Sequence, residues 1–374
     1  MGHLIPLAEL AKKLTITHGF SVTLITFSNF SNKAQTSLLS SLPSTISSIS
    51  LPLIPLHGLP SNYPIDLVFS TFFSRSLPSL HSILSSLTST THVTAYITDI
   101  FGAESLSTAR SLAVPPFLFF TTTLLPLSFM LHLPDLNTSS PPDPLTLPGC
   151  IPILTEDLPD GWEGYKRMLR HAKHYNEADG ILVNSFINIE PGAARFLLDE
   201  DKPGRPRVHP IGPLIQTSSI GDADIGNCMT WLDEQPRGSV LFVCFGSGGT
   251  LSVKQTNELA LGLEMSGQGF LWAVRSPSDS DASGPYFDSE SARDPFAFLP
   301  QRFVERNRGV GKVVALMKRP RSGSLTHRPW GVRYVALWVE PDVGECGEWQ
   351  SLVISVARYA AGERMNLCDL WRRA

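Results

Sequence analysis

The stretch from Ser239 to Thr250 reads Ser-Val-Leu-Phe-Val-Cys-Phe-Gly-Ser-Gly-Gly-Thr, and it decides the fold class of the chain. Its first part, Val240 to Phe245, is a continuous apolar run rich in Val and Phe. Such a run is typical of a strand buried on both faces of a parallel sheet. A glycine-rich turn ends the run, and an apolar pattern of helical type follows from Val253 to Met265. The stretch therefore predicts a strand, a tight turn and a helix in an α/β sheet.

The glycine-rich turn is suited to bind an anion. Gly246, Ser247 and Gly248 would bring backbone N–H groups and a hydroxyl close to a phosphate, at the positive end of a helix dipole. A plain tight turn explains the same residues equally well, so both interpretations stay open. The spacing is not that of the G-x-G-x-x-G dinucleotide fingerprint, and no Gly-Lys-Ser/Thr follows, as a Walker A loop requires.

The composition describes a globular, reduced protein of two domains. The chain has 374 residues, of which 42% are hydrophobic and 17% charged, and this length predicts two domains. A net charge of −4 without a long basic run argues against a nucleic-acid partner. The five cysteines are scattered without a C-x-x-C pair, which indicates a cytoplasmic protein. Prolines interrupt the most apolar stretch, residues 114–134, so no membrane span is expected.

Predicted helices and strands alternate along the chain. We expect helices at residues 8–14, 67–87 in two pieces, 103–112, 165–178 and 191–198, and strands at 20–27, 49–54, 93–100, 117–120, 180–184 and 270–274. This alternation predicts parallel sheets with helices on both faces. The segment 208–227 contains Gly212, Pro213 and a run rich in Ser, Gly and Asp, and it is expected to link the two domains.

His3 and Asp99 are the candidates for acid–base chemistry. Asp99 lies near the end of the strand predicted at 93–100, and His3 lies at the start of the first helix. Both are therefore expected at the edge where open parallel sheets bind ligands. A histidine beside a carboxylate makes a general base with an orienting partner. The alternative is that His3 is a frayed terminal residue and Asp99 a helix cap, and the residues alone favour this alternative.

Several longer motifs resemble those of one protein family. They are Gly2-His3-Leu4-Ile5-Pro6-Leu7, Thr98-Asp99-Ile100-Phe101-Gly102, Asn184-Ser185-Phe186 with Glu190-Pro191-Gly192, Pro210-Ile211-Gly212-Pro213-Leu214, Trp231-Leu232-Asp233, and Phe245-Gly246-Ser247-Gly248-Gly249-Thr250. Together they are similar to the plant UDP-dependent glycosyltransferases of family 1, most closely to the branch that glucosylates hydroquinone and monolignols. The resemblance covers residues 1 to about 315.

The resemblance implies an α/β fold of the GT-B type, with two Rossmann-like doubly wound domains. Residues 1–207 would form the acceptor-binding domain, 208–227 the linker, and 228–315 the start of the UDP-sugar-binding domain. The second domain would be incomplete, and residues 316–374 would form an aberrant tail. The protein is expected to be a monomer.

The resemblance also implies roles for single residues. His3 would take the proton of a phenolic hydroxyl, and Asp99 would orient and stabilise its imidazole. Ile100 and Phe101 would face the acceptor, while Gly246, Ser247 and Gly248 would contact the diphosphate. The co-substrate would be a UDP-sugar, by family default UDP-glucose, and transfer would invert the anomeric carbon. No cofactor and no metal are expected.

The sequence departs from the family at both ends. The strand of about ten residues that the family has before its Gly-His motif is missing, so His3 is expected to lose support. No Trp-Ala-Pro-Gln or His-Cys-Gly-Trp-Asn-Ser box follows residue 315, although the family binds its donor there. We therefore expect weak binding of a UDP-sugar.

The tail is compatible with a shifted reading frame. From Ala336 to Ser351, codons displaced by one nucleotide permit His-Cys-Gly-Trp-Asn-Pro-Thr-Leu-Glu-Ser-Val-Ala-Asn-Gly-Ser-Pro. Both glycines are forced, by Trp338-Val339 and by Trp349-Gln350. We hypothesise that the tail is an out-of-frame product of a mutated gene or a faulty gene model.

Two alternatives to an active transferase stay open. The first is an inactive remnant that binds small phenols without turnover. The second is an NAD(P)-dependent reductase that uses the turn at Gly246, although the strand at 270–274 is not followed by an acidic residue. The motifs do not identify the acceptor.

Overall fold

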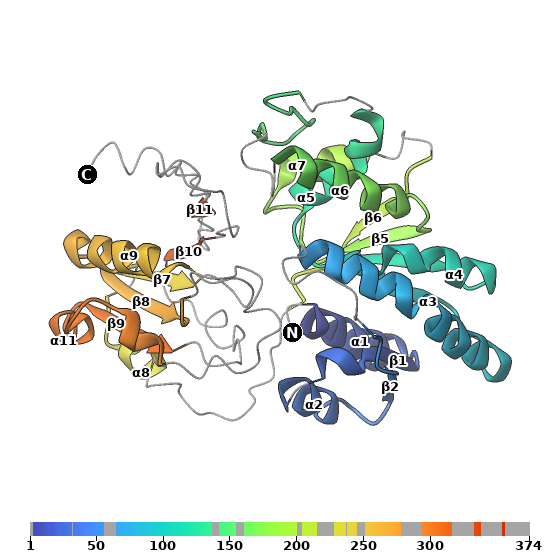
Figure 1. The fold of residues 1–374 in the computed structure, drawn as a ribbon, viewed down its shortest axis with the longest axis horizontal. Helices are drawn as coiled ribbons and strands as arrows, with labels where there is room; N and C mark the ends of the chain where they lie inside the picture. Colours follow the sequence, from blue (N-terminus) through green and yellow to red (C-terminus); the bar gives the residue numbers. More distant parts are fainter. Residues whose placement is uncertain are drawn as a thin grey trace. The chain divides into compact units, whose positions relative to one another are not determined.

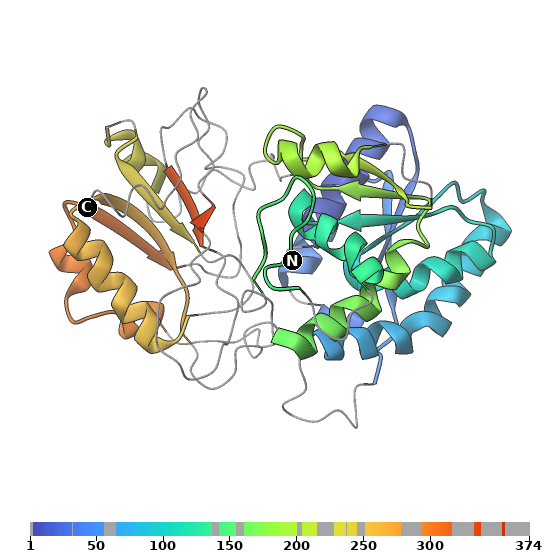
Figure 2. The same cartoon turned by 90° about the horizontal axis from the view of Figure 1, so that it is seen from above.

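The chain folds into two compact units, Met1–Ile215 and Gln216–Ala374. A computed structural model describes residues 3–31, 33–55, 65–136, 142–154, 161–199, 204–214, 228–236, 238–244, 251–277, 294–315, 333–337 and 354–355. Parallel strands and the helices that cover them form each unit (Figure 1; Figure 2 shows the same ribbon from above).

The first unit contains two parallel sheets. Its larger sheet has the order β3-β4-β5-β6, built from β3 (Tyr96–Asp99), β4 (Pro116–Phe120), β5 (Gly180–Val183) and β6 (Arg207–Pro210). A separate sheet pairs β1 (Val22–Phe27) with β2 (Ile46–Leu51) in parallel. Because Asp99 pairs with Phe119 in the β3–β4 register, the carboxyl ends of these two strands meet at one edge.

Helices connect the strands of the first unit. They are α1 (Leu4–His18), α2 (Lys33–Ser40), α3 (Ile65–Thr90), α4 (Leu106–Ser111), α5 (Leu124–His132), α6 (Gly161–Tyr175) and α7 (Pro191–Leu197), with 3-10 turns η1 (Ser28–Phe30), η2 (Ile100–Ser105) and η3 (Leu133–Leu136). The helix–strand alternation predicted from the sequence is confirmed, although α2 and α5 were not expected.

The expectation that α3 forms two pieces is wrong. Pro78 lies inside a single helix of 26 residues, although it cannot donate a hydrogen bond to the preceding turn. Phe72, Ser76, Leu80 and Leu84 repeat at four-residue spacing and are all buried, so both halves bury the same face. This continuous apolar face offsets the lost hydrogen bond.

Side chains of β4 divide between the two faces of the sheet. Leu118 and Phe120 join a buried cluster with Leu124, Leu127 and residues of β5 on one face. Phe119 packs on the opposite face, in a cluster with Leu10 of α1. Because successive side chains of a strand point to opposite faces, β4 is covered by α1 on one side and by α5 on the other.

The second unit has one sheet of order β11-β10-β7-β8-β9. Its strands are β7 (Val240–Cys244), β8 (Gly269–Val274), β9 (Gly311–Ala315), β10 (Arg333–Leu337) and the antiparallel β11 (Ile354–Ser355); its helices are α8 (Cys228–Asp233), α9 (Val253–Ser266) and α11 (Phe303–Arg306), with the 3-10 turn η6 (Pro295–Phe298). The strand and the helix predicted around the glycine-rich turn are confirmed as β7 and α9. The core includes Val243, Phe270, Trp272, Leu263 and Phe303.

Strand order reverses beside β7. The chain passes from β7 to β8 on one side, whereas β10 pairs in parallel with the other side of β7. The carboxyl end of β7 therefore lies at a topological switch point, where doubly wound sheets bind ligands.

Residues 333–337 belong to the tail that we expect to be aberrant, and they extend this sheet. Similarly, residues 208–210 of the expected linker belong to β6, because they pair with β5.

We predict that Leu118→Ala destabilises the first unit by about 2–5 kcal/mol, because Leu118 is fully buried in the middle of β4 and its truncation leaves a cavity. The matched control Leu53→Ala removes the same atoms from a side chain that is 73% exposed, and should change stability by less than about 0.5 kcal/mol. Calorimetric unfolding measures both. Equal effects would contradict the assignment of this core.

Candidate active site

His3 and Asp99 form a hydrogen-bonded pair at one edge of the first unit. His3 immediately precedes α1, and Asp99 is the last residue of β3. The His3 Nδ1 and Asp99 Oδ2 atoms lie 2.8 Å apart, and the two side chains are 31% and 15% exposed. The pair is thus partly shielded from water while the imidazole stays accessible to a reactant.

The second oxygen of the Asp99 carboxylate binds the backbone. Asp99 Oδ1 accepts hydrogen bonds from the N–H groups of Phe101 and Gly102, at 3.1 and 3.2 Å, and so caps η2. The sequence interpretation that treated Asp99 as a helix cap is therefore correct but incomplete, because the same carboxylate also binds His3. Two backbone donors on Oδ1 leave Oδ2 facing the imidazole.

The hydrogen bond fixes which imidazole nitrogen is available. An ionised carboxylate only accepts hydrogen bonds, so His3 Nδ1 carries the proton and donates it to Asp99 Oδ2. The other nitrogen, Nε2, then carries a lone pair that can accept a proton. Among the described residues, Thr121 in the turn after β4 places its Oγ1 3.5 Å from Nε2. The geometry suits His3 to accept a proton at Nε2.

Aromatic rings cover one side of the imidazole. Phe101 stacks on His3 with the ring centroids 4.9 Å apart and an interplanar angle of 19°. Phe69 of α3 stacks in turn on Phe101 at 4.8 Å. Phe101, which we expected beside the acceptor, is therefore in contact with His3. Ile100 instead packs against the cluster that contains Leu118 and Phe120, and its place in an acceptor pocket stays a prediction.

Gly102 and Tyr96 hold η2 close to β3. A Cβ atom at Gly102 would lie 2.1 Å from Thr98 Oγ1, so only glycine allows this approach. The Tyr96 hydroxyl lies 2.8 Å from Ser105 Oγ, and burial raises the pKa of Tyr96 above its usual value. Tyr96 thus stays neutral while it bonds Ser105, and this bond supports the backbone that Asp99 caps.

The predicted diphosphate-binding residues Gly246, Ser247 and Gly248 lie outside the residues that the structure describes. Their flanks are described. β7 ends at Cys244 beside the switch point, and α9 starts with a capping box in which Ser252 Oγ accepts from the Gln255 N–H at 3.1 Å. The turn therefore stays a prediction, placed between a confirmed strand and a confirmed helix.

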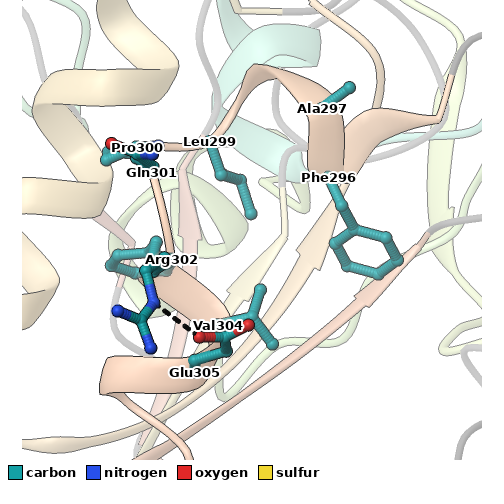
Figure 3. Close-up of a pocket in the computed structure, with 9 residues that line it drawn as sticks. Phe296, Ala297, Leu299, Pro300, Gln301, Arg302, Val304 and Glu305 are labelled. Carbon is teal, nitrogen blue, oxygen red and sulfur yellow. Dashed lines mark hydrogen bonds and ion pairs between the residues drawn. The ribbon is translucent and has the colours of Figure 1, made fainter.

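The second unit contains a shallow pocket between η6 and α11, lined by Phe296, Leu299, Arg302, Val304 and Glu305 among others (Figure 3). The ion pair of Arg302 Nε with Glu305 Oε2, at 2.8 Å, lies in it. It contains none of the residues predicted for the site, so we assign it no chemistry.

The described part of the chain contains neither a metal-binding group of side chains nor a membrane-spanning helix. No group of three or more His, Cys, Asp and Glu side chains is arranged there to hold a metal. Among the described helices, none is both long and apolar enough to cross a bilayer.

Solved structures of plant UDP-glycosyltransferases are similar to this chain. A UDP-glucosyltransferase from Polygonum tinctorium capable of glucosylating indoxyl, in complex with 3,4-dichloroaniline, is 41% identical, with a TM-score of 0.76 over 89% of this chain and 73% of that one. Phytolacca americana UGT2, complexed with UDP-2fluoro-glucose and pterostilbene, is 44% identical, with a TM-score of 0.72 over 84% and 69%. The fold is thus of the GT-B class, as predicted.

Curated relatives define the family. Hydroquinone glucosyltransferase from Rauvolfia serpentina is 42% identical over 350 residues, which are 88% of this chain and 74% of that protein. UDP-glycosyltransferase 72B3 of Arabidopsis thaliana is 43% identical over 347 residues, 88% and 71% of the two chains. No protein-family model matches the chain. The chain belongs to the plant family 1 UDP-glycosyltransferases, and this membership removes the reductase alternative.

The structure also shows contacts that the sequence analysis missed. Thr121 contacts His3, Phe69 stacks on Phe101, and Glu190 accepts hydrogen bonds from the start of α5, which follows the turn that contains Thr121. Phe69 and Thr121 belong to apolar or Thr-rich stretches that carry no motif. Glu190 stood within a quoted motif, but the sequence alone gave no reason to connect it with His3.

We predict that Asp99→Asn moves the imidazole proton from Nδ1 to Nε2. The amide oxygen must stay on the two backbone N–H groups of η2, so the amide NH₂ replaces Oδ2 and can only donate to Nδ1. The imidazole ¹⁵N chemical shifts of His3 report this change. A proton that remains on Nδ1 in this variant would refute the assigned geometry.

Asp99→Ala is the matched variant, because it removes the cap together with the partner of His3. Asp99→Ala should lower the free energy of unfolding by about 1 kcal/mol. Asp99→Asn keeps the cap, so its free energy of unfolding should stay near the wild-type value.

Proposed function

We propose that the protein transfers glucose from UDP-glucose to a hydroxyl group of a small phenol, with His3 as the general base. The observation that carries the proposal is the 2.8 Å contact between His3 Nδ1 and Asp99 Oδ2, which leaves Nε2 as the proton-accepting nitrogen. The relatives support a phenolic acceptor, because their names and complexes include hydroquinone and pterostilbene.

In the proposed reaction, His3 Nε2 takes the proton of the phenolic hydroxyl. The phenolic oxygen attacks the anomeric carbon as the bond from that carbon to the UDP oxygen breaks, so UDP leaves and the configuration inverts. The proton stays on His3, and the negative charge of Asp99 stabilises the imidazolium that forms. The stacked rings of Phe101 and Phe69 make the surroundings of His3 apolar on the side that they cover.

Gly246, Ser247 and Gly248 are proposed to bind the diphosphate. Their support is the position of the preceding strand, since β7 ends at a topological switch point. Family 1 enzymes use a UDP-sugar as co-substrate and no cofactor, and UDP or a UDP-sugar is named in structures of relatives. Residues 1–207 would bind the acceptor, and residues 228–315 would begin the donor domain.

One alternative keeps a specific observation in its favour. In this alternative, the protein is a remnant that binds small phenols without turnover. The observation in its favour is that the sequence after residue 315 lacks the donor box of the family. The His3 site belongs to the first unit and does not depend on that box. Binding of a phenol and transfer of glucose are therefore separable properties.

We propose in addition that the protein is a cytoplasmic monomer. The support for this location is the cysteine set, which is scattered along the chain and has no C-x-x-C pair. Sedimentation of the purified chain tests the monomeric state.

A direct assay incubates the protein with UDP-glucose and hydroquinone and measures the glucoside by mass spectrometry. We expect turnover that falls at least about 100-fold in His3→Gln, because a positioned general base contributes that much. His81→Gln is the matched control, since it removes the same imidazole from an exposed position on α3.

Two results would change the proposal. Glucoside formation that survives His3→Gln would exclude His3 as the base. Hydroquinone binding without turnover would instead support the remnant alternative. In that case, sequencing the transcript through codons 310–366 shows whether a frame change in the tail hides the donor box.

A further inference from the structure

Glu190 connects α7 to the turn that contacts His3. Its carboxylate accepts hydrogen bonds from the N–H groups of Leu124 and Leu125, with Oε2 at 2.6 Å and Oε1 at 3.0 Å. Ser185, which is buried, places its hydroxyl 3.4 Å from Oε2. Glu190 itself directly precedes α7 and lies outside α5.

The first turn of α5 depends on this carboxylate. Thr123 precedes α5 as its cap residue, but its side chain makes no capping hydrogen bond. The first N–H groups of a helix have no partner within the helix, so a side chain from elsewhere has to satisfy them. Both oxygens of Glu190 do so, and its negative charge lies at the positive end of the helix dipole.

The connection between β4 and the start of α5, where Glu190 binds, is short. β4 ends at Phe120 and α5 begins at Leu124, so only residues 121–123 lie between a core strand and the clamped helix. Thr121 lies in this turn, and its Oγ1 is 3.5 Å from His3 Nε2. Because β4 and α5 fix both ends of this connection, they also fix the Thr121 hydroxyl beside His3 Nε2, the nitrogen that accepts the proton.

We propose that Glu190 is a positioning residue for the transfer reaction, because it clamps the start of α5 and thereby holds Thr121 against His3 Nε2. This inference rests on the proposed function in one respect, namely that His3 is the base. Glu190 does not touch the reacting atoms, and it acts only through the turn of residues 121–123.

The test reads the His3 imidazole directly and needs no UDP-sugar. The ¹⁵Nε2 chemical shift of His3 is measured at fixed pH in the full chain, with the resonance assigned from its loss in His3→Gln. Glu190→Gln keeps the size of the side chain but places an NH₂ group against one of the two backbone N–H groups. Thr121→Val removes the hydroxyl and keeps the shape.

We expect Glu190→Gln to move the Nε2 resonance in the same direction as Thr121→Val, and the double variant to move it no further than Thr121→Val alone. Such non-additivity is the mark of two residues that act through one contact. Glu177→Gln is the matched control, because Glu177 pairs with His174 and belongs to neither α5 nor α7, and it should leave the resonance in place.

Other outcomes would overturn the proposal. An unchanged Nε2 resonance in Glu190→Gln, together with a lower melting temperature, would make Glu190 a purely structural residue. Additive shifts in the double variant would show that Glu190 acts by another route. Should Glu190→Gln fail to fold, Glu190→Asp keeps the charge and shortens the reach by one methylene, and an unmoved resonance in that variant would also refute the proposal.

Where transfer is measurable, the same variants separate binding from chemistry. Glu190→Gln is expected to lower kcat by about ten- to a hundredfold, because misplacing a catalytic contact by about 1 Å has an effect of that size. KM for the phenol should change little. Absence of transfer in the wild-type chain would count against the proposed function, while the resonance test would still decide the role of Glu190.

Discussion

The carboxylate of Asp99 is the constraint on which the first unit's site depends. One oxygen binds two backbone N–H groups of η2, and the other binds the imidazole of His3. The charge is therefore shared between a backbone turn and a side chain that belongs to the distant N-terminal end of the chain. Because the turn orients the carboxylate, and the carboxylate orients the imidazole, the direction of Nε2 follows from the conformation of residues 100–105.

Much of the fold follows from local sequence patterns. Continuous apolar runs identified β4, β5, β7 and β8, since strands buried on both faces need no polar residues. α5 was missed because it is apolar almost throughout and has Pro126 in its first turn, where proline is tolerated. α3 was divided wrongly because the packing of its buried face outweighs the effect of Pro78.

Less of the site follows from the sequence. The expected position of Asp99 and His3 at one sheet edge made them candidates for acid–base chemistry, and the family resemblance then gave them roles and added Phe101. Nothing local connects Glu190 with Leu124, because the two residues are 66 positions apart and meet only after β4 and β5 pair. Contacts between backbone groups and remote carboxylates leave no pattern in the residue types around them, so a three-dimensional arrangement is needed to find them.

The division of the first unit into two sheets has a further consequence. Among the strands that the structure describes, β1 pairs only with β2, and β3 pairs only with β4. Each sheet therefore ends in a strand whose outer backbone groups meet no neighbouring strand in this part of the chain. A strand edge that lacks a neighbour can accept an extended segment through backbone hydrogen bonds. Any segment that pairs with β1 or β3 would therefore add to these two edges.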